Sequence, residues 1–505
     1  MATATAPLPP GEQVDAPLSA RLSNVVYPLA LGAAIALWLV AVRAPFWVDE
    51  TLAYWQVSGG FAKIWSRSAQ MPSSLAFLYL LWLEKSLLGS REILLRLPSI
   101  AAMLAAVFFL FRAARELFSR EVAFLAAILF SLHVDVLFAA IDVRPYAYAL
   151  LAATVAIFAF ARWIARHEIR YAVLFGAAAA GVIHFHYLFG SILLAFPIYY
   201  LMVRRNSIRA DLPQIGAALA AFGVVALPLL PRFVALFSAR QLHTFAGKPD
   251  NFFILRTLVP FKMLVTFVAV AFLAACVRKL RLPDRASLRR LLFCLLLMFV
   301  PIAILYGISS ATRTHVFIPR YCLAAVPGAM LTWGYLASRI DSRRLRQLFC
   351  IGLVTYAAIS LFRYPNHASH EISFKPAFDF VNASVAQDGA PVLVCSAFIE
   401  SDYEPLPTGL DAENALVSQL TYYRVNAPVA LLPISLNDQA LQAGRDQVLR
   451  AAQQRQRFLA LGGPASYPTL RWLANYASVA FAVREVGDFN QVVVLEFVPM
   501  SASGQ

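Results

Sequence analysis

Two adjacent carboxylates, Asp49 and Glu50, stand directly after the first long apolar run of the chain. That run, residues 26–42, carries no charge and is long enough to cross a lipid bilayer. A carboxylate held at a membrane surface can take a proton from a reacting group or position a cation. Alternatively, either acid could cap a helix that begins near Thr51. The pair predicts an active site that opens at the membrane surface, with Asp49 and Glu50 as catalytic candidates and Tyr54 as a cavity-lining neighbour.

A second polar group, Asp142 and Arg144, falls in a very short connection between two apolar runs. A carboxylate there is energetically expensive unless it is paired or functional, so Asp142 is a further catalytic candidate. Arg144 is a candidate ligand for an anion, although the two side chains could simply pair with each other. Tyr146 follows closely and fits either a cavity-lining position or an aromatic belt at the membrane interface.

A third group surrounds Arg320, which opens a late apolar run beside Tyr321 and follows His315. A guanidinium at a membrane surface is well suited to bind a lipid phosphate through two parallel hydrogen bonds. The simpler alternative is a side chain that snorkels to the interface. His184 and His186 stand at another junction, and their i, i+2 spacing is only a weak signal for a metal site. We expect both histidines, with Tyr321, to line a cavity.

The composition identifies the class of protein that holds these groups. The 505 residues are 60% hydrophobic and 14% charged, with a mean hydropathy of +0.66, well outside the range of soluble globular chains. The formal net charge is +15, but the basic residues stand largely between apolar runs. Membrane orientation and anionic lipid headgroups explain that distribution better than nucleic acid does. The sequence predicts a multi-pass membrane protein that contacts membrane lipids and binds no nucleic acid.

The arginine-rich connectors between the apolar runs predict the topology. By the positive-inside rule five such connectors are cytoplasmic, which places the N-terminus in the cytoplasm and the C-terminal domain outside. Residues 1–24 then form a disordered cytoplasmic tail, and residues 25–364 form the membrane domain. About eleven transmembrane helices are expected, at residues 25–44, 94–112, 122–140, 146–163, 171–186, 188–203, 213–231, 259–277, 291–309, 320–338 and 347–364.

One apolar run, residues 75–88, does not fit this count. It is short and contains two charges, so we interpret it as an interfacial helix within a long outer loop, residues 45–93. Asp49 and Asp142 then emerge on the same outer face. The loop also carries Lys63 and Arg67, and cations on this side of the membrane suggest either an anionic ligand or contact with lipid headgroups.

Residues 365–505 have the composition of a soluble domain that alternates strands and helices, which predicts an extracytoplasmic α/β domain. Strands are expected at 391–395, 429–433, 457–461 and 491–497, with helices at 374–385 and about 437–454. The domain contains a single cysteine, so neither an internal disulfide nor a cysteine-based metal site is expected there.

The order of these motifs resembles a known family. The sequence reads Trp47-Val48-Asp49-Glu50-Thr51, later Asp142-Val143-Arg144-Pro145-Tyr146, and finally Pro319-Arg320-Tyr321. This order is similar to that of the bacterial family 39-type members of the GT-C glycosyltransferase superfamily, whose relatives include protein O-mannosyltransferases and lipid A aminoarabinose transferases. The resemblance covers the whole membrane part. It departs from the family at Met71-Pro72-Ser73-Ser74, where His-Pro-Pro is common, and this departure affects the expected donor or acceptor contacts at that point.

The resemblance implies a GT-C fold and a hexosyl or pentosyl transferase of the inner (cell) membrane. It would use a polyprenyl-phosphate-linked sugar as donor and a lipid, glycan or protein hydroxyl as acceptor, on the extracytoplasmic face. By position, Asp49 matches the family's catalytic aspartate, Glu50 its neighbour, Asp142 and Arg144 the second outer-loop motif, and Arg320 a cation that meets the donor phosphate. Arg144, His315, Lys63 and Arg67 would assist Arg320. A divalent cation is used by some relatives in the superfamily and stays an open question.

The main alternative is a transporter or flippase of lipid-linked glycans, which would use the same outward cations. Such a protein would be expected to carry gating charges at mid-membrane. Here the predicted spans are nearly free of charge at their centres, and this favours an enzyme. A glycan polymerase or ligase of another superfamily would share the outer face but not the early Asp-Glu pair.

Overall fold

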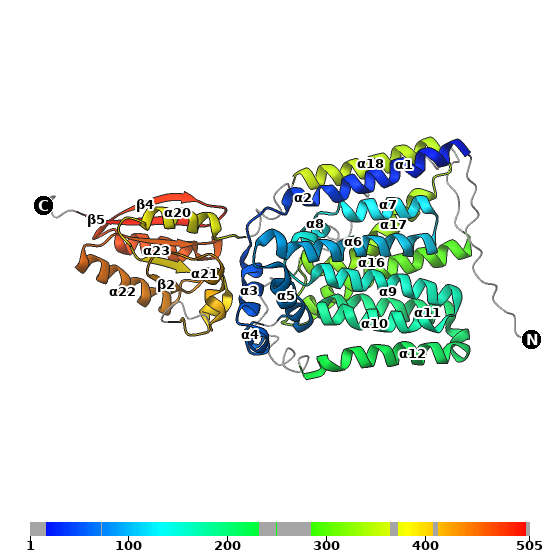
Figure 1. Ribbon diagram of the computed structural model, residues 1–505, viewed down its shortest axis with the longest axis horizontal. Coiled ribbons are helices and arrows are strands. Elements are labelled where there is room, and N and C mark those ends of the chain that lie inside the picture. Colours follow the sequence, from blue (N-terminus) through cyan, green and yellow to red (C-terminus); the bar gives the residue numbers. More distant parts are fainter. Residues whose placement is uncertain are drawn as a thin grey trace, which may run out of the picture. The chain divides into compact units, whose positions relative to one another are not determined.

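The computed structural model describes residues 17–71, 73–231, 249, 284–363, 372–407 and 413–500. The chain divides into two compact units. The first unit comprises Met1–Val42 and Ile93–Pro365, and the second comprises Arg43–Glu92 and Asn366–Gln505. The outer loop that carries Asp49 therefore groups with the C-terminal domain. Figure 1 labels the elements of both units.

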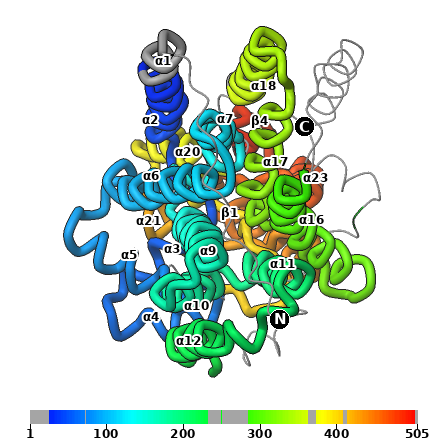
Figure 2. The backbone as a smooth tube through the Cα atoms, turned by 90° about the vertical axis from the view of Figure 1, so that its right-hand side faces the viewer, coloured from blue at the N-terminus to red at the C-terminus, as the bar shows by residue number. Residues whose placement is uncertain are grey.

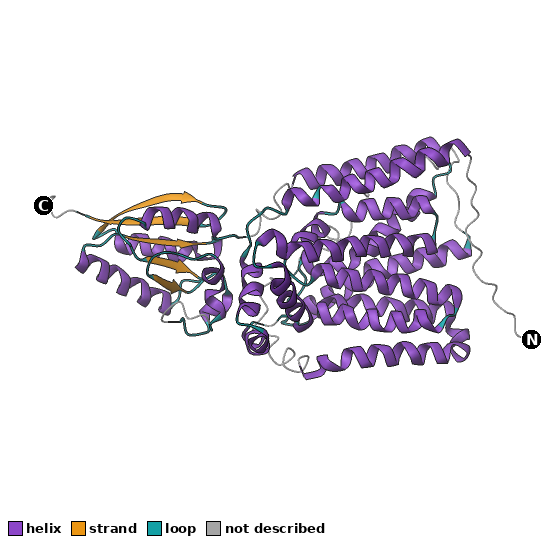
Figure 3. Ribbon diagram, viewed as in Figure 1, coloured by secondary structure: helices purple, strands orange, loops and turns teal. Residues whose placement is uncertain are grey.

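The first unit consists of helices, which Figure 3 draws in purple. Its longer α-helices have bounds α1 (Pro17–Ala36), α2 (Trp38–Ala41), α6 (Glu92–Leu117), α7 (Arg120–Ser131), α8 (Val134–Ile141), α9 (Tyr146–Arg166), α10 (Ile169–Phe185), α11 (Ala195–Arg204), α12 (Ile208–Ala226), α16 (Arg285–Ala311), α17 (Val326–Ser338) and α18 (Arg343–Arg363). Within the described residues they are accompanied by the 3-10 segments η2 (Tyr187–Leu194), η3 (Arg205–Ser207), η4 (Leu227–Leu229) and η5 (Pro319–Ala325).

Several of these helices are suited to a membrane. Among the described residues, five helical segments are long and apolar enough to cross a bilayer, or six if the bent pair α7–α8 counts as one span. Two shorter apolar helices, Val25–Ala41 and Ile169–Phe185, also coincide with predicted spans. The multi-pass helical class predicted from the sequence is confirmed. The span predicted at 259–277 lies outside the described residues, and the total of eleven crossings stays a prediction.

The span predicted at 122–140 is interrupted in the structure. Helices α7 and α8 meet at an angle of 67° across a short break. His133 precedes α8 in extended conformation, and its Nδ1 accepts a hydrogen bond from the Asp135 N–H at 3.3 Å. A side chain that satisfies the first N–H groups of a helix stabilises a new helix start there. The apolar run alone does not indicate this break, because hydropathy is insensitive to helix direction.

Close packing of small residues joins α10 to α12. Figure 2, turned by 90°, shows α10 between α9 and α12, and α10 packs against both. A Cβ atom added to Gly176 of α10 would stand 2.0 Å from the Ala218 carbonyl oxygen of α12. The two backbones therefore approach as closely as glycine permits, as is common where membrane helices associate.

The second unit begins with the helices of the outer loop, which are α3 (Val48–Ser58), η1 (Phe61–Lys63), α4 (Ile64–Gln70) and α5 (Leu75–Leu88). Helix α5 has the bounds predicted for the interfacial helix. Ser74 caps it, since its Oγ accepts the Phe77 N–H at 3.1 Å, and Gly89 ends it with a positive φ of 87°. Leu87 is 75% exposed on this helix. Its position relative to a bilayer stays a prediction.

The C-terminal domain contains all the strands of the described chain (Figure 3). Its sheet has the order β2-β1-β3-β5-β4, in which β1 pairs in parallel with β2 and β3, while β5 is antiparallel to β3 and β4. The strands are β1 (Val392–Cys395), β2 (Val429–Leu432), β3 (Phe458–Gly462), β4 (Phe481–Asp488) and β5 (Val493–Pro499). The helices are α20 (Lys375–Val385), α21 (Ser418–Tyr422), α22 (Asp438–Gln454) and α23 (Tyr467–Ala477). This confirms the α/β class predicted for the domain.

The two faces of the sheet form separate hydrophobic cores. Because successive strand residues point to opposite faces, Val392 and Val394 face one core while Leu393 and Cys395 face the other. Helices α22 and α23 cover the second core. Helices α20 and α21 cover the first, which also includes Val48, Leu52 and Trp55 of α3. The outer-loop helix α3 therefore shares a core with the sheet.

Candidate functional site

The two neighbouring acids at the start of α3 have different surroundings. Glu50 is 1% exposed, and its Oε2 accepts a hydrogen bond from the Trp47 N–H at 3.2 Å. This is the contact of a side chain in the first helical turn that satisfies the backbone before the helix. Asp49 is partly exposed in the same turn. The geometry gives Glu50 a capping role, and the two acids differ in burial.

Tyr54 lies about one turn after Asp49 on α3. Its side chain contacts residues of both chain segments of the second unit, Arg43–Glu92 and Asn366–Gln505. Its hydroxyl donates to Ser90 Oγ at 3.2 Å, and its ring packs edge-on against Tyr422 with centroids 4.7 Å apart. The Lys85 ammonium stands 5.4 Å from the Tyr54 ring, within the range of a cation–π contact. Lys85 of α5 and Tyr422 of α21 thus pack against Tyr54, on the helix that carries Asp49.

The two predicted phosphate ligands of this unit, Lys63 and Arg67, both have protein partners. Lys63 forms an ion pair with Glu413. Arg67 is 3% exposed, donates to the Trp55 carbonyl and to Ser58 Oγ, and lies 3.6 Å from the same glutamate. These contacts join α3 and α4 to the C-terminal domain. A role in phosphate binding stays a prediction for both cations.

In the first unit, Asp142 and Arg144 occupy the turn between α8 and α9, as the sequence predicts. Asp142 is 2% exposed, and its backbone carbonyl accepts a hydrogen bond from Ser99 Oγ of α6 at 2.9 Å. Pro145 then precedes α9, whose first residue is Tyr146. The turn is therefore fixed against α6 on one side and initiates α9 on the other.

His186 is the centre at which several predicted residues meet. It stands at the junction of α10 and η2, with ring centroids 5.3 Å from Tyr146, 4.5 Å from Phe189 and 5.2 Å from Tyr321. Its Nδ1 is buried without a hydrogen-bond partner. The His186 ring therefore brings together Tyr146, two residues after Arg144, and Tyr321, the neighbour of Arg320.

Arg320 and His315 lie on the segment that leads into α17. The Arg320 guanidinium stands 5.7 Å from the ring of Tyr321 in η5. His315 Nδ1 is 2.9 Å from the Ser309 carbonyl oxygen, and Ser309 Oγ accepts the Val316 N–H at 2.8 Å. Ser309 thus fixes the strand-like residues that precede η5 and so positions Arg320.

His184, in the last turn of α10, contacts a different helix. Its Nε2 stands 2.5 Å from the Val225 carbonyl oxygen of α12. The sequence places these two histidines together, but the end of α10 separates their side chains. The cavity-lining role predicted for His184 stays a prediction.

The described residues contain no group of three or more His, Cys, Asp or Glu side chains arranged to hold a metal ion. Within the same residues Cys294, Cys322, Cys350 and Cys395 are free thiols. Metal dependence stays an open question.

One polar pair of the first unit was missed in the sequence analysis. His133 and Asp135 form a contact of 3.7 Å between Nδ1 and a carboxylate oxygen at the break between α7 and α8. The signal was present in the sequence, since a histidine and an aspartate interrupt an otherwise apolar run. Polar groups inside a predicted span indicate either function or a helix break.

Comparisons with known proteins agree with this fold. A family model described as dolichyl-phosphate-mannose-protein mannosyltransferase matches residues 72–230, a segment that contains Asp142, Arg144 and His186. No curated protein matches the chain by sequence. Two crystal structures of ArnT from Cupriavidus metallidurans, one in the apo state and one bound to undecaprenyl phosphate, are each 13% identical to the chain with a TM-score of 0.56.

Each ArnT match covers 94% of this chain and 98% of the ArnT chain. At this identity the likeness establishes the fold, and it extends over both units. The resemblance predicted from the sequence motifs is confirmed by the family model and by the fold together. The chain thus has the fold of the ArnT structures, and over residues 72–230 it resembles the dolichyl-phosphate-mannose-protein mannosyltransferases.

Proposed function

We propose that this protein is a membrane glycosyltransferase that moves a sugar from a polyprenyl-phosphate donor to an acceptor hydroxyl on the extracytoplasmic face of the inner membrane. The observation that carries the proposal is the aromatic group around His186, in which Tyr146 and Tyr321 bring together the segments that carry Arg144 and Arg320. Arginines on both of these segments suit an anionic ligand, and a phosphate accepts the bidentate hydrogen bonds that arginine offers. The rings beside them suit the apolar part of a lipid-linked donor.

The comparisons support a lipid-phosphate donor. One of the two ArnT structures with this fold is described as bound to undecaprenyl phosphate. The family model that matches residues 72–230 is named for a dolichyl-phosphate-mannose donor. Both ligands are long isoprenoid phosphates. The sugar is a hexose or a pentose in this proposal, and the acceptor is a lipid, glycan or protein.

The proposed reaction needs one base and one anion site. Asp49 takes the proton of the acceptor hydroxyl while that oxygen forms a bond to the anomeric carbon of the sugar. The bond from the anomeric carbon to the phosphate oxygen breaks, and the lipid phosphate leaves with the bonding electrons. Arg320 and Arg144 stabilise the charge that develops on the phosphate. Attack opposite to the leaving group inverts the configuration at the anomeric carbon.

A reconstituted assay separates this proposal from a flippase. The purified protein in vesicles receives a polyprenyl-phosphate sugar and a mixture of cell-envelope acceptors. We expect free polyprenyl phosphate to accumulate together with glycosylated acceptor, as measured by mass spectrometry. Movement of intact donor across the bilayer without release of lipid phosphate would contradict the enzyme and support the transporter.

The shared outer face of Asp49 and Asp142 depends on the topology, which cysteine labelling tests. Ser119 is exposed at the start of α7, in a connector that the positive-inside rule places in the cytoplasm. We expect Ser119→Cys to react with an impermeant maleimide only after the membrane is opened. Exposed Ser478 of the C-terminal domain gives the control, because Ser478→Cys should react from outside. Labelling of intact cells at position 119 would reverse the topology.

A further inference from the structure

The backbone that leads into Asp49 is bonded to residues of the C-terminal domain. The Phe46 N–H donates to the Tyr423 hydroxyl at 2.7 Å, and the Phe46 carbonyl accepts from Ser373 Oγ at 2.8 Å. The Val48 N–H donates to the Ile372 carbonyl at 3.2 Å. Three hydrogen bonds therefore fix the two residues that flank Trp47, immediately before the first turn of α3.

Tyr423 is suited to this role because its hydroxyl both accepts and donates. While it accepts from Phe46, it donates to the Glu92 carboxylate. Burial raises the pKa of Tyr423, and the hydrogen bond and charge of Glu92 raise it further. The hydroxyl therefore keeps its proton throughout the physiological range and can donate it to the Glu92 carboxylate.

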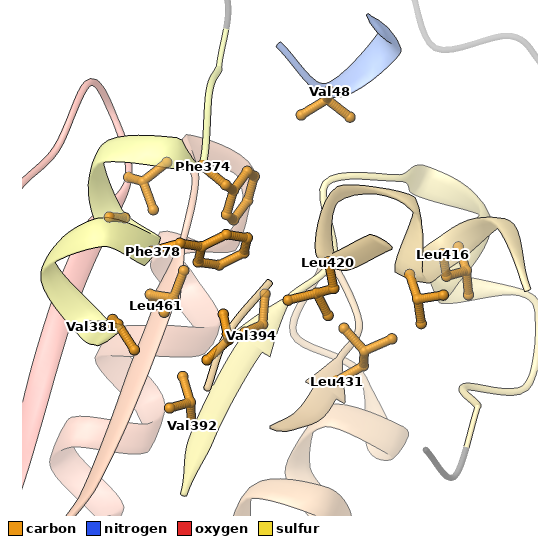
Figure 4. Close-up of a cluster of buried hydrophobic side chains, with 14 of the residues drawn as sticks. Val48, Phe374, Phe378, Val381, Val392, Val394, Leu416, Leu420, Leu431 and Leu461 are labelled. Atoms are coloured by element: carbon orange, nitrogen blue, oxygen red, sulfur yellow. The ribbon is translucent and has the colours of Figure 1, made fainter. Parts of the chain in front are cut away.

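Packing reinforces the same attachment. Phe46 is fully buried, and its ring lies 4.8 Å from that of Tyr422. Val48 belongs to the hydrophobic core that covers one face of the sheet, and Figure 4 shows it above Phe374 and Leu420. The residues on both sides of Trp47 are thus buried together with the domain.

The far end of the α3–α4 segment is attached as well. The Gln70 side-chain amide donates to the Glu413 carbonyl at 2.9 Å and accepts the Ala415 N–H at 3.2 Å. Lys63 adds its ion pair with Glu413. A segment held at both ends by one domain has little freedom to reorient.

We propose that the C-terminal α/β domain positions the catalytic aspartate, with Tyr423 and Ser373 as positioning residues that hold the Phe46 backbone and so direct the first turn of α3. This inference depends on the proposed function, because it assigns the domain a task at the site where Asp49 acts as base. A base must be held within a fraction of an ångström of its productive position, so a looser entry to α3 slows proton transfer without altering donor binding.

The test compares Tyr423→Phe with Tyr467→Phe in the full-length protein. Tyr467 lies in the same domain and its hydroxyl donates to the Gln491 carbonyl at 3.2 Å, so each substitution removes a tyrosine hydroxyl that bonds the backbone. We expect Tyr423→Phe to lower kcat about five- to tenfold with donor Kd unchanged, and to accelerate hydrogen exchange at the Phe46 amide. Tyr467→Phe should match wild type in both measurements.

A double variant separates the failure of this inference from the failure of the proposed function. If Tyr423 acts through Asp49, adding Tyr423→Phe to Asp49→Asn leaves the residual rate unchanged within about twofold. An active Asp49→Asn would overturn the base assignment itself. An inactive Asp49→Asn combined with normal kcat in Tyr423→Phe would overturn only the positioning role. Should Tyr423→Phe fail to fold, Ser373→Ala removes the bond to the Phe46 carbonyl and is judged by the same readouts.

Discussion

Asp49→Asn is expected to lower kcat for sugar transfer by at least about 100-fold, because the amide cannot take the acceptor proton. The substitution is nearly isosteric and lies at a partly exposed position, so the protein should fold and bind donor as the wild type does. The measurement is release of polyprenyl phosphate under single-turnover conditions, with donor binding followed separately. An effect on kcat alone indicates an interaction made in the transition state.

Asp379→Asn provides the matched control. Asp379 is an exposed acid of the same unit that pairs with Lys375 on α20. Asp379→Asn removes the same charge as Asp49→Asn, and the Asp379→Asn protein should retain full activity. Turnover by Asp49→Asn at a rate near that of this control would rule out Asp49 as the base.

Arg320→Ala should produce the second large effect, a weakening of donor use by roughly 10- to 150-fold. Charged hydrogen bonds contribute about 1.5–3 kcal/mol, and about 1.4 kcal/mol corresponds to a factor of ten. Arg320→Lys should lie between the alanine variant and wild type, because lysine keeps the charge but lacks the planar fork. A higher KM with unchanged kcat would indicate that Arg320 binds the phosphate of the ground-state donor. A lower kcat would indicate that Arg320 stabilises the leaving phosphate in the transition state.

Arg339 is the matched control for Arg320. It follows the other end of the same helical segment, and its guanidinium lies 5.8 Å from the Tyr335 ring, nearly the spacing of Arg320 to Tyr321. Arg339→Ala removes an equivalent cation–π contact at the end that we predict to face the cytoplasm. Equal donor kinetics for the two alanine variants would reduce Arg320 to an interfacial anchor.

The sequence predicts the local elements of this fold well, because their signals are local. The bounds of α5 agree with the predicted interfacial helix, and β1, β2, β3 and β5 fall where buried-strand patterns occur. The edge strand β4 was not predicted. Many residues of β4 are polar or exposed, so the strand lacks a clear apolar pattern. This composition is expected for a strand at the unpaired edge of a sheet.

The site was predictable only in part. Short-range motifs single out Arg144, Tyr146 and Arg320, and the structure brings Tyr146 and Tyr321, the neighbour of Arg320, to His186. No pattern in the sequence connects Tyr423 to Phe46, since contacts of this kind are set by packing between remote segments. Likewise the sequence favours Asp49 over its neighbour only through the family resemblance, whereas the structure separates the two acids by the burial of Glu50 and its hydrogen bond to the Trp47 N–H.

The bond between Phe46 and Tyr423 spans 377 positions of the chain, and this has a consequence for biogenesis. During synthesis the early helices emerge and can enter the membrane long before the ribosome reaches Tyr423. Until then the entry to α3 lacks its partners, and the Asp49 turn cannot take its final geometry. A segment synthesised late thus completes the entry to α3, so the early helices can be inserted before the Asp49 turn is in place.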